Sequence, residues 1–275
     1  MDIRGKVFVI TGAGNGVGRE LALLLLGRGA KAVAGIDKRS THLDETEALV
    51  TQARVAGTFS KHVADVTDRA AIEALPATIE ALHGPVDGVI NDAGIIHAFE
   101  PISKLTIEEI KLVVDTNFWG TVYVTKAFLP GLLARPEAKL IDFSSMGALA
   151  PVPGQTAYGA SKGAVKAFTE GIYAELLETN VSVSVVFPGG MQTNIAGNSG
   201  IPVPDMATID PKVAQMMAPT TPQAAAKQIV EEAIEKGEFR IVIGSDAHSL
   251  DRTARLMPTK VIKIIADRMK SIIGG

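Results

Sequence analysis

The sequence lacks cysteine, a strong excess of charge of either sign, and any long apolar run. Without cysteine the chain forms no disulfide and no thiolate metal site, which fits a reducing compartment. A formal net charge of −3 gives no electrostatic reason to expect a nucleic acid as partner. No run approaches the roughly 18 apolar residues of a membrane-spanning helix, and the first apolar run ends at once in glycines, unlike a signal peptide. We therefore expect a soluble, cytoplasmic protein.

Two kinds of site are also missing from the sequence. The histidines stand at positions 42, 62, 83, 97 and 248, with no pair at metal-ligand spacing, so we predict no metal site. No Gly-x-Ser-x-Gly elbow occurs, so hydrolase chemistry is not expected. Internal repeats, low-complexity tracts and linkers are absent as well. We interpret residues 1–275 as a single domain.

Short apolar runs alternate with longer helical patterns along the whole chain. Strands are expected at 6–11, 31–37, 60–66, 87–92, 139–145, 181–187 and 240–244. Helices are expected at 18–30, 41–56, 68–82, 104–134, 156–179 and 221–236. Strands that are apolar on both faces and separated by helices predict a parallel sheet covered on both sides. Right-handed crossovers make this a Rossmann-type, doubly wound α/β sheet of about seven strands.

The segment TGAGNGVG, residues 11–18, follows the first expected strand and opens the first expected helix. Gly12 permits a tight turn, Gly16 lets the backbone approach a pyrophosphate, and Gly18 allows the helix to pack closely on the strand. The free N–H groups of the helix start attract an anion. We predict a dinucleotide-binding turn made of Gly12, Gly14, Asn15, Gly16, Val17 and Gly18.

Asp37 ends the second expected strand, close to the spacing of about 20 residues after the glycine turn at which an acidic residue binds the adenosine ribose. Its carboxylate accepts a hydrogen bond from a 2′-hydroxyl and repels a 2′-phosphate, which favours NAD as the cofactor. Lys38 and Arg39 follow directly and are able to neutralise a phosphate. NADP therefore stays open as the alternative.

Further motifs follow in order: Asp65-Val66, NDAG at 91–94, Asn117 in DTNFWGT, FSS at 143–145, YGASK at 158–162 and PGG at 188–190. With the glycine turn they resemble the short-chain dehydrogenase/reductase family, in its common single-domain form, over nearly the whole chain. The resemblance implies an NAD(P)-dependent oxidoreductase that interconverts a secondary alcohol and a ketone. NDAG departs from the more frequent Asn-Asn-Ala-Gly at Asp92.

The resemblance implies a catalytic set. Tyr158 resembles the general acid/base, and Lys162 the residue that binds the nicotinamide ribose and lowers the tyrosine pKa. A spacing of four puts both on one helix face, and a nearby ammonium favours the phenolate. Ser145 resembles the serine that polarises the substrate carbonyl, with Ser144 as the neighbouring alternative that strand alternation points the other way. Asn117 resembles the asparagine that holds a water in a proton relay; the alternative is a helix-kinking or capping residue.

The resemblance also implies contacts with the rest of the cofactor. Asp65 and Val66 match the pair that contacts the adenine ring, and Thr193 matches the threonine that reaches the nicotinamide carboxamide. Beyond the glycine turn, the predicted cofactor contacts are Asp37, Lys38, Asp65, Val66, Asn91, Ala93, Gly94, Tyr158, Lys162, Pro188, Gly189 and Thr193.

Residues 189–222 break the alternation and are rich in Gly, Pro and Met, so we interpret them as a lid over the substrate. Apolar residues there and after Ser145 predict an adaptable surface for a bulky hydrophobic alcohol or ketone, such as a steroid- or lipid-like molecule. The alternative is that the methionines only fill gaps in the core. The residues concerned are Met191, Met206, Met216, Met217, Met146, Leu149, Pro151 and Val152.

The C-terminal tail, residues 252–275, carries six basic residues against one acidic residue, and its apolar residues recur at helical spacing from Val261 to Ile273. A basic amphipathic helix of this kind is typical of membrane-surface contact. We favour instead a helix that packs over the substrate site or on a neighbouring subunit, with a solvated basic face.

Three functions are compatible with a dinucleotide-binding turn in an α/β fold: an oxidoreductase, a cofactor-binding scaffold or redox sensor, and a nucleotide-dependent epimerase or dehydratase. A catalytically competent oxidoreductase is favoured, because Ser145, Tyr158 and Lys162 are all present, whereas a cofactor-binding scaffold or redox sensor has no need of all three. A nucleotide-dependent epimerase or dehydratase is expected to be longer, with different glycine spacing. The resemblance implies a homodimer or homotetramer assembled through the helices near 104–134 and 156–179.

Overall fold

The computed structural model describes residues 1–201 and 220–273. Its centre is a parallel sheet of seven strands in the order β3-β2-β1-β4-β5-β6-β7. The strands are β1 (Val7–Thr11), β2 (Ala32–Asp37), β3 (Thr58–Val63), β4 (Gly88–Asn91), β5 (Ala138–Phe143), β6 (Val181–Pro188) and β7 (Arg240–Ile243). This order confirms the predicted Rossmann-type, doubly wound sheet.

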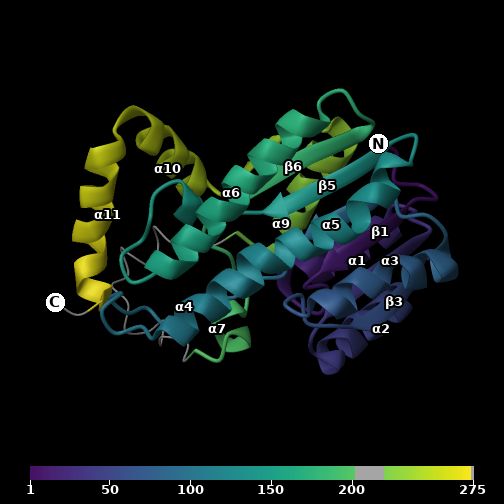
Figure 1. Cartoon of the computed structure of the whole chain (residues 1–275), viewed down its shortest axis with the longest axis horizontal. Helices are drawn as coiled ribbons and strands as arrows, with labels where there is room; N and C mark the ends of the chain where they lie inside the picture. Colours follow the sequence, from purple (N-terminus) through teal and green to yellow (C-terminus); the bar gives the residue numbers. More distant parts are fainter. Residues whose placement is uncertain (202–219, 274–275) are drawn as a thin grey trace.

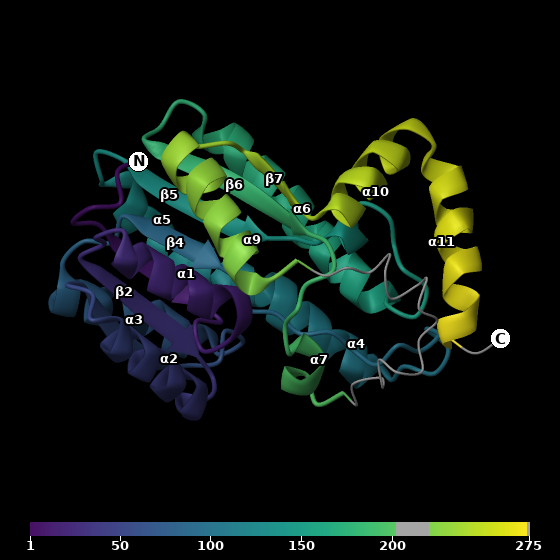
Figure 2. The same ribbon diagram turned by 180° about the vertical axis from the view of Figure 1, so that it is seen from behind.

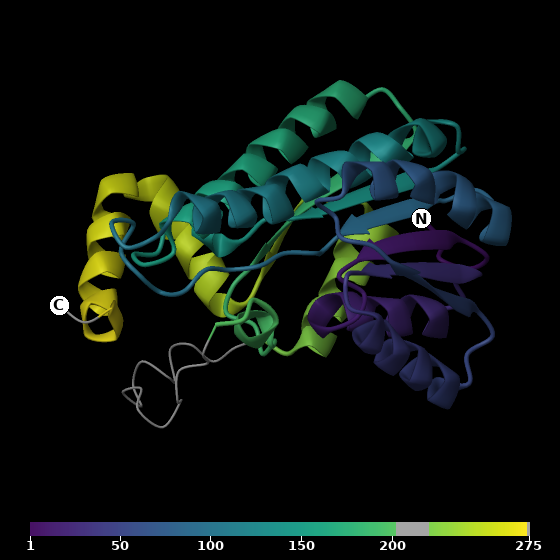
Figure 3. The ribbon, with the colours of Figure 1, turned by 60° about the horizontal axis from the view of Figure 1, so that its bottom comes forward.

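Helices cover both faces of the sheet (Figure 1, Figure 2). One face carries α1 (Gly16–Gly27), α2 (Ser40–Ala53) and α9 (Pro222–Ile229), and the other carries α3 (Arg69–His83), α5 (Gly120–Leu133) and α6 (Thr156–Leu176). The π-helical turn η1 (Asp115–Trp119) joins α4 (Ile107–Val114) to α5, and η4 (Val230–Lys236) extends α9. Figure 3 shows the two helical layers on opposite sides of the strands.

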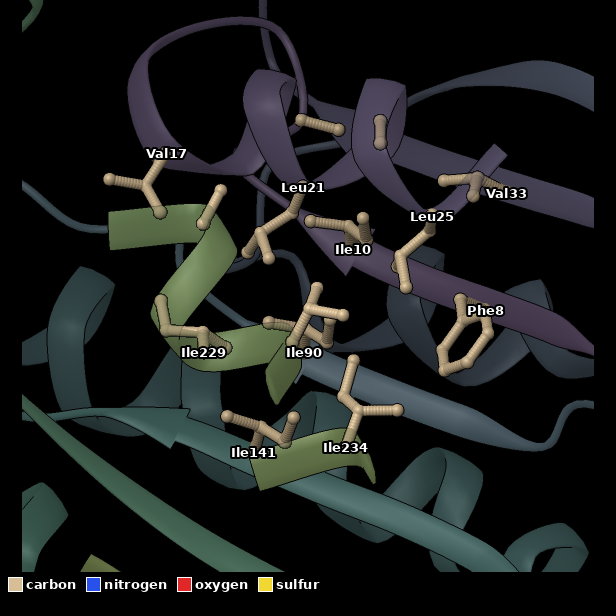
Figure 4. Packing of buried hydrophobic residues seen from close by; sticks show 14 of the residues in the cluster. Phe8, Ile10, Val17, Leu21, Leu25, Val33, Ile90, Ile141, Ile229 and Ile234 are labelled. Atoms are coloured by element: carbon tan, nitrogen blue, oxygen red, sulfur yellow. The ribbon is translucent and has the colours of Figure 1, made fainter. Parts of the chain in front are cut away.

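The core explains why the strands are almost continuously apolar. All five residues of β1 are buried, because helices cover both faces of the sheet. On the face of α1 and α9, Ile10 of β1 lies next to Leu21 and Leu25 of α1, and Ile90 and Ile141 of the next two strands lie next to Ile229 and Ile234 (Figure 4). Full burial of a side chain of this size stabilises the fold by about 1.5–3 kcal/mol.

The chain runs outward in both directions from the middle of the sheet, where β1 pairs with β4. The connections from β1 lead toward β2 and β3, and those from β4 lead toward β5, β6 and β7. A crevice forms at such a reversal, outside the carboxyl ends of the strands. The fold therefore places the loops that follow β1, β2, β4 and β5 around one site.

Several element boundaries differ from those expected. β3 ends at Val63 and β5 at Phe143, so Asp65 and Ser145 lie in the loops beyond the strands rather than within them. The helix expected over 104–134 is interrupted by η1.

The C-terminal part consists of two helices, α10 (Ser245–Leu256) and α11 (Pro258–Ile273), which extend away from the sheet (Figure 1). The sequence pattern missed the start of α10, because SDAHSLDRTARL is largely polar. Pro258 ends the first helix and starts the second, as expected of a residue without an N–H. Leu256 is 80% exposed and Ile262 49% exposed. Within the described ranges, no helix has the length and apolar character needed to cross a membrane.

Part of the segment interpreted as a lid is described. It contains the short helix α7 (Ile195–Asn198). Its two ends meet, because Met191 forms a parallel bridge with Thr220 and the Thr220 N–H donates to the carbonyl of Gly190 over 2.8 Å. Met206, Met216 and Met217, on which the lid prediction partly depended, lie outside the described residues.

Candidate active site

A cavity of about 280 Å³ lies at the carboxyl ends of the strands. Most of the residues predicted to bind cofactor or substrate line it. These are Gly12, Asn15, Gly16, Val17, Asp37, Lys38, Asp65, Val66, Ala93, Gly94, Ser145, Tyr158, Lys162, Pro188, Gly189 and Thr193. Four predicted residues are not among the lining residues: Gly14, Gly18, Asn91 and Asn117. Their side chains or backbones shape the cavity from behind.

The glycine turn has the backbone conformation that the sequence predicted. Gly12 and Gly16 have φ values of 72° and 55°, a region that favours glycine. The Gly12 N–H donates to the carbonyl of Ile36 over 2.8 Å, which ties the turn to β2. A Cβ on Gly18 would lie 2.5 Å from the Gly12 carbonyl oxygen. Gly18 therefore serves close packing, and the start of α1 at Gly16 faces the cavity.

Arg19 braces the back of this turn, a role that sequence reasoning missed. Its guanidinium donates to the carbonyl of Gly14 and, over 3.2 Å, to the hydroxyl of Thr46 on α2. It also pairs with Glu45 at 2.6 Å. Thr46 in turn donates to the carbonyl of Ala13 over 2.9 Å. No local sequence signal reveals this role, because it depends on how α2 packs against α1.

Asp37 faces the cavity from the end of β2. One carboxylate oxygen accepts the Gly14 N–H over 3.2 Å, and the other accepts the Arg39 N–H over 3.0 Å. Arg39 itself reaches across to α7, where its guanidinium donates to the carbonyl of Asn198 over 2.8 Å. Of the two basic residues that keep NADP open, Arg39 is therefore already engaged with the protein.

The adenine-side residues and Asn91 occupy different surroundings. Asp65 lines the cavity and accepts hydrogen bonds from the backbone and hydroxyl of Thr67, at 2.9 and 2.8 Å. Val66 packs closely against Gly120, where a Cβ would lie 2.6 Å from the Val66 side chain. The Asn91 amide is buried and donates to Asp142 and Thr125 rather than lining the cavity.

Tyr158 and Lys162 enter the cavity from α6, one turn apart, and Ser145 enters from the loop after β5. Ser145 lies close enough to Tyr158 for its hydroxyl to lower the tyrosine pKa. Ser145 also accepts the Gly147 N–H over 3.1 Å. The neighbouring Ser144 donates instead to the carbonyl of Lys162 over 2.9 Å. The structure therefore brings Ser145 close to the tyrosine. Ser144 also lines the cavity, so strand alternation does not separate the two serines.

The charges around Tyr158 differ from the expectation. Burial raises the pKa of Tyr158, the nearby hydroxyl of Ser145 lowers it, and the negative charge of Asp92 raises it further. Lys162 is not among the groups that lower this pKa, and its ammonium donates to the carbonyl of Phe143 over 2.8 Å. Burial lowers the pKa of Lys162 to about 8, against the opposing effects of Asp92 and Asp142.

Asn117 is fully buried within η1, and its side chain is already hydrogen-bonded. Its oxygen accepts the Ile95 N–H over 2.8 Å, and its nitrogen donates to the Ile95 carbonyl and to Ser161, each over 2.9 Å. A Cβ on Gly94 would lie 3.2 Å from the Asn117 oxygen and 3.3 Å from Lys162 Nζ. Asn117 therefore fastens the loop after β4 next to the lysine.

Two acidic residues flank Lys162, and their electrostatic role was not predicted. Asp92 lines the cavity near Gly18, and burial raises its pKa to about 7. Asp142 lies fully buried on β5, accepts from Asn91 at 2.8 Å and from Thr169 at 2.9 Å, and has its pKa raised by burial to about 6. The sequence shows both acids, but only the fold brings them to one lysine.

The predicted apolar substrate surface is only partly present. Met191 lines the cavity, together with Ile95, Ile96 and Ile195, which the sequence analysis did not single out. Met146 and Leu149, in contrast, pack against a small core cluster that includes Phe187 and Ala247. These two residues therefore pack on the core rather than line the cavity, contrary to the prediction.

Asp246 of α10 holds the start of the lid segment. Its carboxylate accepts the Gly190 N–H over 2.7 Å, and a Cβ on Gly189 would collide with it. Gly244, with φ of 94°, leaves room for the same side chain. Sequence reasoning missed this contact, because the two segments lie more than fifty residues apart.

Comparisons with known proteins agree with this fold. The sequence model of the short chain dehydrogenase family matches residues 6–201. A protein of Mycobacterium tuberculosis strain H37Rv, named as the oxidoreductase SadH, is 37% identical over 270 residues, which cover 95% of this chain and 94% of that protein.

Two crystal structures share the fold. A short chain dehydrogenase from Burkholderia cenocepacia J2315, in complex with NADP, has a TM-score of 0.78 at 24% identity and covers 96% of this chain and 99% of its own. A short chain dehydrogenase/reductase from Burkholderia phymatum, in complex with NAD, has a TM-score of 0.81 at 23% identity, with 93% and 95% covered. The family match, the sequence similarity and the ordered motifs lead to one conclusion: this chain belongs to the short-chain dehydrogenase/reductase family of oxidoreductases.

Proposed function

We propose that this chain is an NAD(P)-dependent oxidoreductase that interconverts a secondary alcohol and a ketone. One observation carries the proposal: Ser145, Tyr158 and Lys162 line the same cavity as the start of α1. A group able to transfer a proton and a helix start able to bind an anion thus share one cavity, which fits hydride transfer between a dinucleotide and a carbonyl.

The glycine turn and Asp37 fit a dinucleotide. The N–H groups at the start of α1 would hold the diphosphate, and the Asp37 carboxylate would accept from a ribose hydroxyl. When bound, the nicotinamide supplies or accepts the hydride. Lys162 would donate to the nicotinamide ribose, since its ammonium reaches the cavity wall.

Tyr158 would hold and move the proton. In ketone reduction the phenol donates its proton to the carbonyl oxygen while Ser145 donates a hydrogen bond to the same oxygen. Burial keeps the phenol protonated near neutral pH, since it raises the pKa of Tyr158. In alcohol oxidation the same phenol must first lose its proton, so the raised pKa opposes that direction at neutral pH.

We propose NAD rather than NADP as the preferred cofactor. The Asp37 carboxylate in the cavity supports this, since it would repel a 2′-phosphate. The engagement of Arg39 with Asn198 supports it as well, because a guanidinium held by α7 is less available to a phosphate. Preference for NADPH in a titration with both reduced cofactors would contradict this proposal.

We propose a hydrophobic substrate, supported by the apolar side chains Ile95, Ile96, Met191 and Ile195 that line the cavity. A panel of steroid-like, long-chain and sugar-derived ketones tests this proposal by initial rates of NADH oxidation. We expect the apolar ketones to turn over fastest, and faster turnover of the sugars would refute it.

The same panel tests the proposed reaction. Cofactor-dependent turnover on at least one ketone supports the oxidoreductase. Tight binding of NADH or NADPH without turnover on any ketone or alcohol would favour the scaffold or redox-sensor alternative.

A further inference from the structure

Asp92 places a carboxylate in the same cavity as the proposed diphosphate site. It follows Asn91, the last residue of β4, and lines the cavity together with Gly16 and Val17 of α1. One of its oxygens lies 2.9 Å from the position of a Cβ on Gly18, in the first turn of α1. An anionic side chain therefore already lies near the helix start that would bind an anion.

The charged groups around Asp92 come from three other elements. Lys162 of α6 favours its ionised form, as does the Gly18 N–H of α1, whereas Asp37 of β2 opposes ionisation. The negative charge of Asp92 in turn raises the pKa of Tyr158, which also lies on α6. Burial outweighs the favourable neighbours and raises the pKa of Asp92 to about 7, so the carboxyl is partly protonated at neutral pH.

A diphosphate at the start of α1 brings further negative charge to this carboxylate. Two like charges in one partly buried site disfavour each other's ionised forms. The Asp92 carboxylate is the group that becomes protonated, because it gains a proton more readily than a diphosphate does. Once protonated, its second oxygen can still accept the Gly18 N–H.

We propose that Asp92 links cofactor binding to proton uptake, so that the dinucleotide binds preferentially to the protein in which Asp92 carries a proton. This inference rests on the proposed dinucleotide function of the cavity. The family's more frequent asparagine at this position carries no charge and has no such link. Asp92 thus acts as a residue that sets cofactor affinity according to pH.

The sign of the effect follows from linkage. The pKa of Asp92 is about 7 without the diphosphate and higher with it, so binding takes up a proton at pH values above 7. Affinity is then greatest below pH 7 and falls as the pH rises. For a group that titrates near 7, the dissociation constant should rise about tenfold between pH 6 and pH 8.

Isothermal titration calorimetry of the full chain tests this inference, with NADH and with ADP-ribose, which retains the diphosphate without the nicotinamide. Titrations at pH 6, 7 and 8, each in two buffers of different ionisation enthalpy, give the dissociation constant and the number of protons taken up. The variant Asp92→Asn removes the charge and keeps an acceptor for Gly18. Asp92→Ser is the second variant, in case the first does not fold. Asp44→Asn, on the exposed face of α2, is the matched control for the loss of one negative charge.

We expect wild-type protein and Asp44→Asn to lose about tenfold in affinity from pH 6 to pH 8, with proton uptake approaching one at pH 8. Asp92→Asn should bind like wild type at pH 6 and about tenfold more tightly than wild type at pH 8. Lys162, whose pKa is about 8, also loses charge in this range. Without Asp92 the lysine would be less charged at pH 8, so an effect caused by the lysine predicts weaker binding by the variant, whereas the Asp92 effect predicts tighter binding.

Three results would overturn the inference: affinity that does not depend on pH, no proton uptake, or weaker binding by the Asp92 variants than by wild type at pH 8. If the protein bound neither ligand at any pH, that result would overturn the proposed dinucleotide function together with this inference.

Discussion

At the scale of single residues, the cavity contains ionisable side chains whose charged forms are disfavoured by burial. Lys162 is 4% exposed and keeps its ammonium because it donates to the Phe143 carbonyl and because Asp92 and Asp142 lie near it. Removing one member of such a buried group leaves the others uncompensated. The chemistry of the site is therefore inseparable from the packing of β4, β5 and α6.

Gly18 offers a prediction at this scale. In Gly18→Ala the new Cβ would lie 2.5 Å from the Gly12 carbonyl oxygen and 2.9 Å from a carboxylate oxygen of Asp92. Both distances are too short, so the turn would have to shift. We expect a loss of about 1–3 kcal/mol in unfolding free energy and a weakened affinity for nucleotide. The control is Gly27→Ala in the same helix, where a Cβ would meet nothing within 4 Å. Equal stability of the two variants in denaturant titrations would contradict the packing argument.

How far the sequence predicted the site depends on the range of each contact. Gly12, Gly16 and Tyr158 could be predicted, because a turn and a helix spacing are local properties. Ser145 was predicted from the family resemblance. The charge of Asp92 was visible, but its surroundings come from α1, β2 and α6 and exist only in the fold. The pKa of Tyr158 moved opposite to expectation for the same reason, since burial has no local signature.

At the scale of elements, the loops at the sheet edge are fastened by single polar side chains. Asp246 of α10 holds Gly190, and Asn117 of η1 holds Ile95. Both contacts join segments far apart in sequence, so α10 and η1 help to position the walls of the cavity. Strand positions could be predicted to within three residues, because their apolar runs are continuous. The start of α10 could not, because its sequence is polar.

Asp246→Ala should loosen the start of the lid segment. The Gly190 N–H would lose its acceptor, at a cost of about 1–3 kcal/mol if it stays buried. We expect a higher KM and faster proteolysis between residues 189 and 222, with little change in the circular dichroism of the sheet and helices. Ser249→Ala, on the exposed surface of α10, is the control, and matching behaviour of the two variants would rule out the proposed fastening.

The junction of β3 and α3 offers a pH-dependent prediction. His62 and His83 both bond through Nε2 to the hydroxyl of Ser60, at 2.9 and 2.8 Å. Burial lowers the pKa of each, and each folded-state pKa therefore lies below its value of 6.5 in the unfolded chain. The stabilising effect of the neutral pair is complete above pH 6.5 and is lost as the pH falls below it.

We expect the denaturation midpoint to drop between pH 7.5 and pH 5.5, and to drop less in His83→Gln. His248→Gln, an exposed change on α10, should follow wild type. A His83→Gln protein with the full wild-type pH dependence would show that another group is responsible.

At the scale of the whole molecule, one surface remains apolar although it faces solvent. Leu112 of α4 and Trp119 of η1 are 56% and 43% exposed, and Trp119 stacks on Tyr123 of α5 with ring centroids 5.9 Å apart. Together they form an apolar stripe along the helices that the family resemblance assigns to assembly. We propose that a second copy of the chain covers this stripe.

Trp119→Glu should therefore shift the protein toward monomers, which light scattering after size-exclusion chromatography measures directly. The control is Leu82→Glu on α3, where the leucine is 61% exposed and lies outside the stripe. A monomeric wild type, or the same mass for wild type and Trp119→Glu, would contradict assembly through this surface.

The central claim is that Tyr158 transfers the proton in a nicotinamide-dependent reaction. The most direct measurement compares ketone reduction and NADH affinity in Tyr158→Phe and in Tyr173→Phe. Tyr173 lies on the same helix with its ring stacked on Phe239, which phenylalanine preserves. We expect Tyr158→Phe to bind NADH like wild type and to lose at least about 100-fold in kcat, while Tyr173→Phe stays near wild type. Turnover by Tyr158→Phe at the wild-type rate would refute the account.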